Sequence, residues 1–341
     1  MMAVDLGIAI VEPRQGQCVL IGSMKANWFR RAWAGLSPLA GLLLLCLLWS
    51  LGSMRSDLLP TPTLNLMPPM ERRALPFAML AVAAAVFAVA RGAKRPRARG
   101  AGAAVLIGLG LFVAPAELAL AAHGWTSELT RVALFSLAPL FAVVFEPYTG
   151  RGAGPQSRSG LLSALVAVAG TLLVFPVGIP GSIESGGAFC AVILAAACVA
   201  AANCGGVKMA HDLPGNSIAS LAVIAGGTAA TGFAAQSALT EQMVWKWNTI
   251  APELAWSAAV ELPALLLLFW LMRRMSATRM TTRFVLAPLM TILIGFMLQR
   301  PAIEPRTWLG LFLMTAGAVG ILLAPEEEPE AGSSLLKLNR K

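Results

Sequence analysis

Charged residues are scarce in this sequence, and long apolar runs take their place. Asp, Glu, Lys and Arg make up 13% of the 341 residues, whereas soluble domains carry about 25%. Apolar residues make up 57%, and the mean hydropathy is +0.73. Apolar runs of about 20 residues recur, each long enough to span a bilayer as a helix. The sequence therefore predicts an all-α polytopic membrane protein, because a barrel would need short alternating strands.

Several motifs that indicate other chemistries are missing from the sequence. It has two histidines, His123 and His211, and no His-Glu-x-x-His pattern, so we predict no metal site. Its five cysteines include no Cys-x-x-Cys pair, which argues against a disulfide framework. Neither a phosphate-binding P-loop nor a Gly-x-Ser-x-Gly elbow is present. We expect no enzyme activity, no cofactor and no ATP drive.

The formal net charge of +9 reflects how the chain is oriented in the membrane. The 26 lysines and arginines lie mainly in short clusters between apolar runs, where they orient membrane helices rather than bind nucleic acid. If the N-terminus is cytoplasmic, most of them fall in cytoplasmic segments. We predict a multi-pass protein of the inner cell membrane, with both termini in the cytoplasm. The sequence leaves open whether translation starts at Met1 or Met24.

Ten membrane-spanning helices are expected, separated by stretches rich in Pro, Gly and charge. Their predicted ranges are 34–54, 73–91, 101–122, 127–146, 158–176, 186–208, 216–238, 251–272, 280–299 and 305–324. Residues 1–33 would form a cytoplasmic N-terminal segment. Residues 325–341 are polar and would form a disordered cytoplasmic tail.

A repeated motif divides the chain into two halves. Leu-Ala-Pro-Leu occurs at 137–140 and again at 286–289, and Ala169-Gly170 matches Ala316-Gly317 in the following span. Residues 34–176 and 186–324 are therefore predicted to be two five-helix repeats. Because five is odd, the second repeat enters the membrane from the opposite side, which gives an inverted-topology repeat with a central site. Pro139 and Pro288 would kink their helices, either to line that site or only to fit the packing.

Ionisable groups within a span usually face a cavity or a partner. Glu261, midway along the eighth span, is the first candidate for binding a proton or a substrate cation, and Glu117 in the third is the second. The alternative is a neutral carboxyl bonded to a neighbouring helix. Arg131, Phe135 and Pro139 share one helix face. Arg131 would bind an anionic substrate group such as a carboxylate, or else pair with Glu128.

Small polar residues in the first and sixth spans form a further candidate group. Asn203 precedes Cys-Gly-Gly, which resembles the stretch from Ser50 to Ser53 that follows Trp49. Such segments line a site when they are unwound or closely packed, although packing through small residues explains them equally well. The candidate substrate- or ion-binding residues are Trp49, Ser50, Ser53, Glu117, Arg131, Phe135, Pro139, Asn203, Glu261 and Pro288.

Five stretches carry a resemblance to a known family: LLWSLGSM at 47–54, ALAAHGWTSELTRVALFSLAPLFAVVFEP at 119–147, GLLSALVAVAGTLLV at 160–174, VLAPLMTILIGFMLQRP at 285–301 and GLFLMTAGAVGILL at 310–323. They resemble EamA-type members of the drug/metabolite transporter superfamily. The resemblance implies a ten-helix secondary transporter, often an exporter of amino acids or other small metabolites.

The function expected from these patterns is a proton-coupled exporter of a small metabolite. Alternating access would occur at a midplane cavity walled by helices one, three, four, six, eight and nine. The alternatives are a membrane scaffold subunit that does not transport and a flippase of a lipid-linked intermediate. The expected partners are a small-molecule substrate and the lipid bilayer, and the sequence leaves a homodimer open.

Overall fold

The computed structural model is a bundle of helices. It describes residues 37–55, 67–93, 98–149, 158–213, 217–240, 247–299 and 304–324. The predicted N-terminal segment 1–33 and the predicted tail 325–341 lie outside the described residues, as do both candidate start methionines.

Eight helical stretches in the described residues are long and apolar enough to cross a membrane. They are α4 (Pro69–Ala90), α5–η1–α6 (Ala98–Gly108, Leu109–Val113, Ala114–Ala121), α7–α8–η2 (Glu128–Phe135, Ala138–Phe145, Glu146–Thr149), α10 (Ile183–Asp212), α11 (Ile218–Thr240), α12–η4–α13 (Trp247–Trp256, Ser257–Glu261, Leu262–Met272), α14–α15 (Ala277–Thr281, Arg283–Gln299) and α16 (Pro305–Leu323). The chain is therefore an all-α multi-pass membrane protein.

Two further apolar helices, α2 (Pro38–Ser53) and α9 (Arg158–Val174), are shorter than the other eight stretches. Every predicted span coincides with a helix of the described chain, with ends that differ by a few residues. Because α2 and α9 are short for a bilayer of about 30 Å, the count of ten membrane crossings stays a prediction, as does the inverted repeat.

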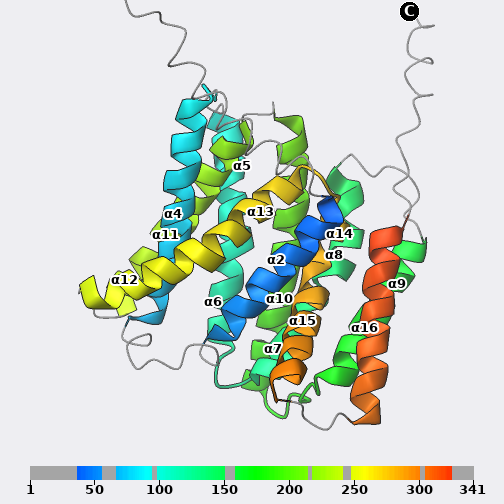
Figure 1. Cartoon of the computed structure of the whole chain (residues 1–341). Coiled ribbons are helices and arrows are strands. Elements are labelled where there is room, and N and C mark those ends of the chain that lie inside the picture. The colour runs from blue at the N-terminus through cyan, green and yellow to red at the C-terminus, as the bar shows by residue number, and fades with distance from the viewer. Residues whose placement is uncertain are drawn as a thin grey trace, which may run out of the picture.

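Helices that are distant in sequence lie side by side in the bundle (Figure 1). The helix α4 packs along α11, and α9 packs along α16. In the centre, α2 packs against α15 and α13, while α10 packs against α8 and α6. The bundle is thus held together mainly by contacts between its N-terminal and C-terminal halves.

Glycines set the close approach of α9 and α16. A Cβ atom at Gly170 would overlap the backbone of Met314, and one at Gly317 would overlap the backbone of Ala167. Small residues let membrane helices approach until their backbones touch, which strengthens van der Waals packing. The two Ala-Gly pairs that match in the sequence therefore lie in one helix contact.

Prolines mark the places where the central helices depart from regular α-helix. The π-turns η1 and η4 come just before Pro115 and Pro263, respectively. A proline has no N–H to donate, so the ladder must rearrange around it, and a π-turn is one such rearrangement. Near Pro139 the helix is interrupted between α7 and α8, whereas α15 runs on through Pro288. The same tetrapeptide thus gives two local structures.

Candidate functional site

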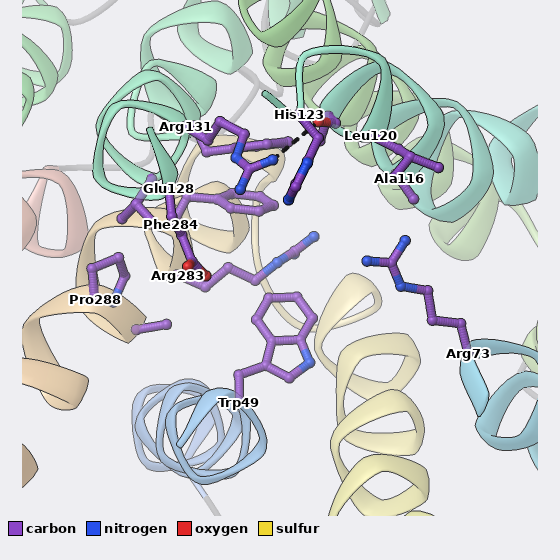
Figure 2. Close-up of a pocket in the computed structure, with 14 residues that line it drawn as sticks. Trp49, Arg73, Ala116, Leu120, His123, Glu128, Arg131, Arg283, Phe284 and Pro288 are labelled. Atoms are coloured by element: carbon purple, nitrogen blue, oxygen red, sulfur yellow. Dashed lines mark hydrogen bonds between the residues drawn. The ribbon is translucent and has the colours of Figure 1, made fainter. Parts of the chain in front are cut away.

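A cavity of about 410 Å³ lies between α2, α4, α6, α7 and α15 (Figure 2). Small-molecule sites typically measure about 300–1,000 Å³, so this volume suits a metabolite. Its lining residues are Trp49, Arg73, Ala116, Ala119, Leu120, His123, Glu128, Arg131, Val132, Phe135, Arg283, Phe284, Ala287 and Pro288. Helix two (α4) lines this cavity although it was not among the predicted walls. Helices six (α10) and eight (α12 and α13) were predicted to line it but contribute no lining residue.

The lining side chains become more buried from the α6–α7 turn inward. His123 and Glu128, at that turn, are exposed. Arg131 and Phe135, one and two turns along α7, are half-buried, and Arg283 is 2% exposed. The cavity therefore opens beside the α6–α7 turn, and Arg283 lies at its deep end.

Arg283 is held by polar and aromatic groups from α2, α10, α14 and its own helix, α15. Its Nη1 donates to Asn203 Oδ1 of α10 at 3.0 Å and to the Met280 carbonyl at 3.3 Å. The guanidinium carbon lies 5.0 Å from the ring centroid of Trp49 and 4.8 Å from that of Phe284. The Nε atom is buried without a hydrogen-bond partner. The side chain is thus fixed in place with donor capacity to spare.

No carboxylate among the described residues forms an ion pair with Arg283. An arginine at the centre of a bilayer costs about 2.5–3.5 kcal/mol on insertion scales. Aromatic faces return part of this cost, about 2 kcal/mol for a desolvated contact. The remaining charge is compensated only by the Asn203 oxygen and a backbone carbonyl, which makes the deep end of the cavity electropositive.

Two further arginines reach the same cavity, Arg73 from α4 and Arg131 from α7 (Figure 2). Arg131 Nη1 donates to the Ala119 carbonyl at 3.3 Å and forms no ion pair with Glu128, the alternative that its sequence neighbourhood offered. Glu128 contributes the one carboxylate of the lining. Among the side chains that line the cavity, arginines outnumber carboxylates three to one.

An aromatic wall runs beside the arginines. The rings of Phe135 and Phe284 stack, with centroids 6.0 Å apart and an interplanar angle of 22°. Trp49 lies 6.2 Å from Phe284, centroid to centroid. Figure 2 shows the Arg283 guanidinium between Trp49 and Phe284, pointing into the cavity. The site combines flat apolar surfaces with cationic donors.

The sequence candidates divide into two groups, of which the first surrounds the cavity. Trp49, Arg131, Phe135 and Pro288 line it, and a second layer lies behind them. In that layer Ser50 Oγ donates to the carbonyls of Cys46 at 2.8 Å and Ala287 at 2.9 Å, and Ser53 Oγ donates to the Ser50 carbonyl at 2.8 Å. Asn203 positions Arg283 and donates its own Nδ2–H to the Val199 carbonyl at 2.7 Å.

The second group lies outside the cavity lining. The Glu261 carboxylate accepts from Ser257 Oγ at 2.7 Å, within the π-turn η4. The Glu117 carboxylate accepts from Gln236 Nε2 of α11 at 2.6 Å. Pro139 is buried in the bundle. In the described parts of the chain, no group of three potential metal-binding side chains gathers.

The most informative side chain of the cavity, Arg283, is not among the sequence candidates. It lies within the predicted span 280–299, but it looks like a flanking charge because Arg273, Arg274 and Arg279 precede it. A signal was available, since Arg283 stands four residues before Ala287 of the repeated motif, on the same helix face. Arg73 and Phe284 were likewise not singled out.

The opposite end of the bundle is closed by contacts between α8, α14 and α16 (Figure 1). The Glu146 carboxylate, at the end of α8, accepts from the backbone N–H groups of Ala277 at 3.0 Å and Thr278 at 3.3 Å, and from the Thr278 hydroxyl. Arg279 Nη2 donates to the Ala324 carbonyl at 2.8 Å. A carboxylate at a helix N-terminus is favourable, so this end is fastened where the cavity end is open.

Comparison with known proteins places the fold but no family. No family model matches the chain, and no curated protein matches it. A solved structure, described only as the crystal structure of a protein, matches with a TM-score of 0.67 over 85% of this chain and 100% of that chain. The two sequences are 18% identical, so the likeness concerns the fold alone. The resemblance to EamA-type transporters stays a prediction.

Proposed function

We propose that the chain is a secondary transporter that moves a small metabolite by alternating access. One observation carries the proposal: a polar and aromatic cavity is open at one end of the bundle, while the other end is fastened by Glu146 and α14. A transporter caught with one gate open would have this form. The substrate site is the cavity that Arg283 and Arg131 line.

The proposal includes ten membrane spans arranged as two inverted five-helix repeats, 34–176 and 186–324. The helix neighbours support it, because the first helix of each proposed repeat packs against the equivalent helices of the other repeat. In the first repeat α2 packs against α15 and α13, and in the second α10 packs against α8 and α6. Phe135 and Phe284 stand at equivalent positions before the two Leu-Ala-Pro-Leu motifs, and they stack on each other. The EamA-type resemblance belongs to the same proposal.

The proposal further specifies that transport is export and that it is coupled to protons. With both termini cytoplasmic, the fastened end faces the cytoplasm and the cavity opens outward. Glu261 is the candidate proton carrier, because it is half-buried in a π-turn and one of its oxygens accepts a hydrogen bond from Ser257. Release of a proton from Glu261 would change the charge in η4, which packs against α2.

The experiment compares spent medium from cells that express the wild type, Glu261→Gln, Arg283→Gln and Arg274→Gln at matched levels. Arg274 stacks on Trp270 outside the cavity and is the control. If the protein exports a metabolite, that metabolite should be equally abundant in the media of the wild type and Arg274→Gln. It should be less abundant in the medium of Arg283→Gln. Proton coupling predicts its depletion for Glu261→Gln as well. Identical media from all four strains would contradict export and favour the scaffold alternative.

A second measurement addresses the gate. Glu146→Gln removes the charge that caps α14, so amide hydrogen exchange at 277–281 should accelerate. Charge-assisted hydrogen bonds contribute about 1.5–3 kcal/mol, which corresponds to roughly a 10- to 150-fold change in local opening. Exchange at the wild-type rate would show that Glu146 does not hold this end closed.

A further inference from the structure

We propose that the cavity binds a small organic acid, with its anionic group at Arg283 and Arg131 and a flat apolar body against Trp49, Phe135 and Phe284. This inference rests on the proposed function, since it names the substrate class of the same cavity. It can be tested by binding alone, without transport.

The position of the anionic group follows from Arg283. This guanidinium is 2% exposed, lines the cavity and has no carboxylate partner among the described residues. Its Nε–H is buried without an acceptor. A guanidinium presents a planar fork that matches the two oxygens of a carboxylate or phosphate. A ligand anion would supply the charge and the acceptor that the described residues do not provide.

The rest of the lining excludes the other charge classes. A cationic ligand would enter a cavity that three arginines surround, with Glu128 as the one opposing carboxylate. Glu128 is exposed and forms no ion pair with the buried Arg283. Like charges in a site of low dielectric constant repel strongly. The lining therefore selects anions over cations.

The aromatic wall defines the body of the ligand. Phe135 and Phe284 stack with an interplanar angle of 22°, and the Trp49 ring lies on the other side of the Arg283 guanidinium. Aromatic rings stack well on flat apolar groups. The volume of about 410 Å³ accommodates a ring or a short chain together with its anionic group. A bare inorganic anion would leave this wall unused.

The test measures binding to the purified full-length protein in detergent by isothermal titration calorimetry. The probes are 3-phenylpropionate, its neutral amide 3-phenylpropanamide, the cation 3-phenylpropylamine and the zwitterion phenylalanine. They share a ring and differ in charge. Phenyl phosphate and inorganic phosphate test the anionic group and the aromatic wall separately. We expect 3-phenylpropionate or phenyl phosphate to bind at least tenfold more tightly than the amide, the amine and inorganic phosphate.

Variants locate the site. Arg283→Gln and Arg131→Gln should each weaken binding of the acids about 10- to 100-fold, the loss expected for one charged hydrogen-bonding partner. Arg274→Gln, outside the cavity, should bind like the wild type. If Arg283→Gln fails to fold, the half-exposed Arg131 still gives a usable variant.

The inference is overturned if the acids bind no more tightly than the amide and the amine, which includes the case in which no probe binds. It is also overturned if Arg131→Gln and Arg283→Gln keep wild-type affinity. Tighter binding of phenylalanine than of 3-phenylpropionate would replace the organic acid by a zwitterion. Export of a cationic metabolite would overturn this inference but leave the proposed transport function in place. Binding of the acids without any transport would support this inference but overturn the proposed transport function.

Discussion

Two arginines, the largely buried Arg55 and the buried Arg283, lie against tryptophan rings but differ in one partner. Arg55 lies 5.4 Å from the Trp256 ring and 2.6 Å from the Glu253 carboxylate, with 11% and 0% of the two side chains exposed. Arg283 lies 5.0 Å from the Trp49 ring and faces the amide oxygen of Asn203 instead of a carboxylate. Within the described residues, one positive charge pairs with a carboxylate, and the other does not.

This difference separates a structural role from a binding role. The Arg55–Glu253 pair joins the end of α2 to α12 and needs no third party. Arg283 lines a cavity, and its charge is compensated only by dipoles and aromatic faces. A neutral partner holds the guanidinium in place without competing for its charge. An anion that enters the cavity can therefore pair with it.

The largest effect should follow from making Arg55 resemble Arg283. Glu253→Gln removes the acid and leaves a buried, unpaired cation, which should lower the free energy of unfolding by about 3–5 kcal/mol. Thermal unfolding in detergent, followed by circular dichroism, measures the loss. Glu304→Gln, at the exposed start of α16, is the control. Equal melting temperatures for the two variants would show that the Arg55 pair is not structural.

A smaller effect on stability should follow from making Arg283 resemble Arg55. Asn203→Asp places a carboxylate where the amide oxygen now lies, 3.0 Å from Nη1. A charge-assisted bond to Arg283 is gained, but the hydrogen bond that Asn203 Nδ2 now donates to the Val199 carbonyl is lost, so the net change in stability should stay within about 1 kcal/mol. The new carboxylate also repels acids, so their affinity should fall about tenfold. Unchanged acid binding would separate Arg283 from the ligand.

The smallest effect is expected at a third arginine–tryptophan contact. Arg274 lies 5.3 Å from the Trp270 ring but is exposed. Substitutions at exposed positions usually change stability by less than about 0.5 kcal/mol. Arg274→Gln should therefore melt within about two degrees of the wild type. A larger shift would mean that the aromatic contact alone, without burial, contributes to stability.

The sequence predicted the helices well because each apolar run is long and bounded by Pro, Gly and charge. It also matched Gly170 with Gly317, which both lie in the α9–α16 contact. Local patterns suffice for such features. The inverted repeat and the ten crossings stay predictions.

The site was less accessible to sequence reasoning because it depends on contacts between distant segments. Arg283 looks like a flanking charge until Trp49 of α2 and Asn203 of α10 are placed beside it. The two Leu-Ala-Pro-Leu motifs are locally identical, yet Pro288 lines the cavity and Pro139 is buried in the bundle. Glu261 has a partner that could have been predicted, because Ser257 precedes it by four residues, one helical turn away.

The measurement that tests the account most directly is the change in melting temperature caused by a saturating concentration of 3-phenylpropionate in the wild type, Glu253→Gln and Arg283→Gln. A ligand that binds only the folded state raises the melting temperature by mass action. We predict equal increases for the wild type and Glu253→Gln, although the latter melts lower, and a much smaller increase for Arg283→Gln. An increase for Arg283→Gln as large as that of the wild type would contradict the assignment of the unpaired arginine to substrate binding.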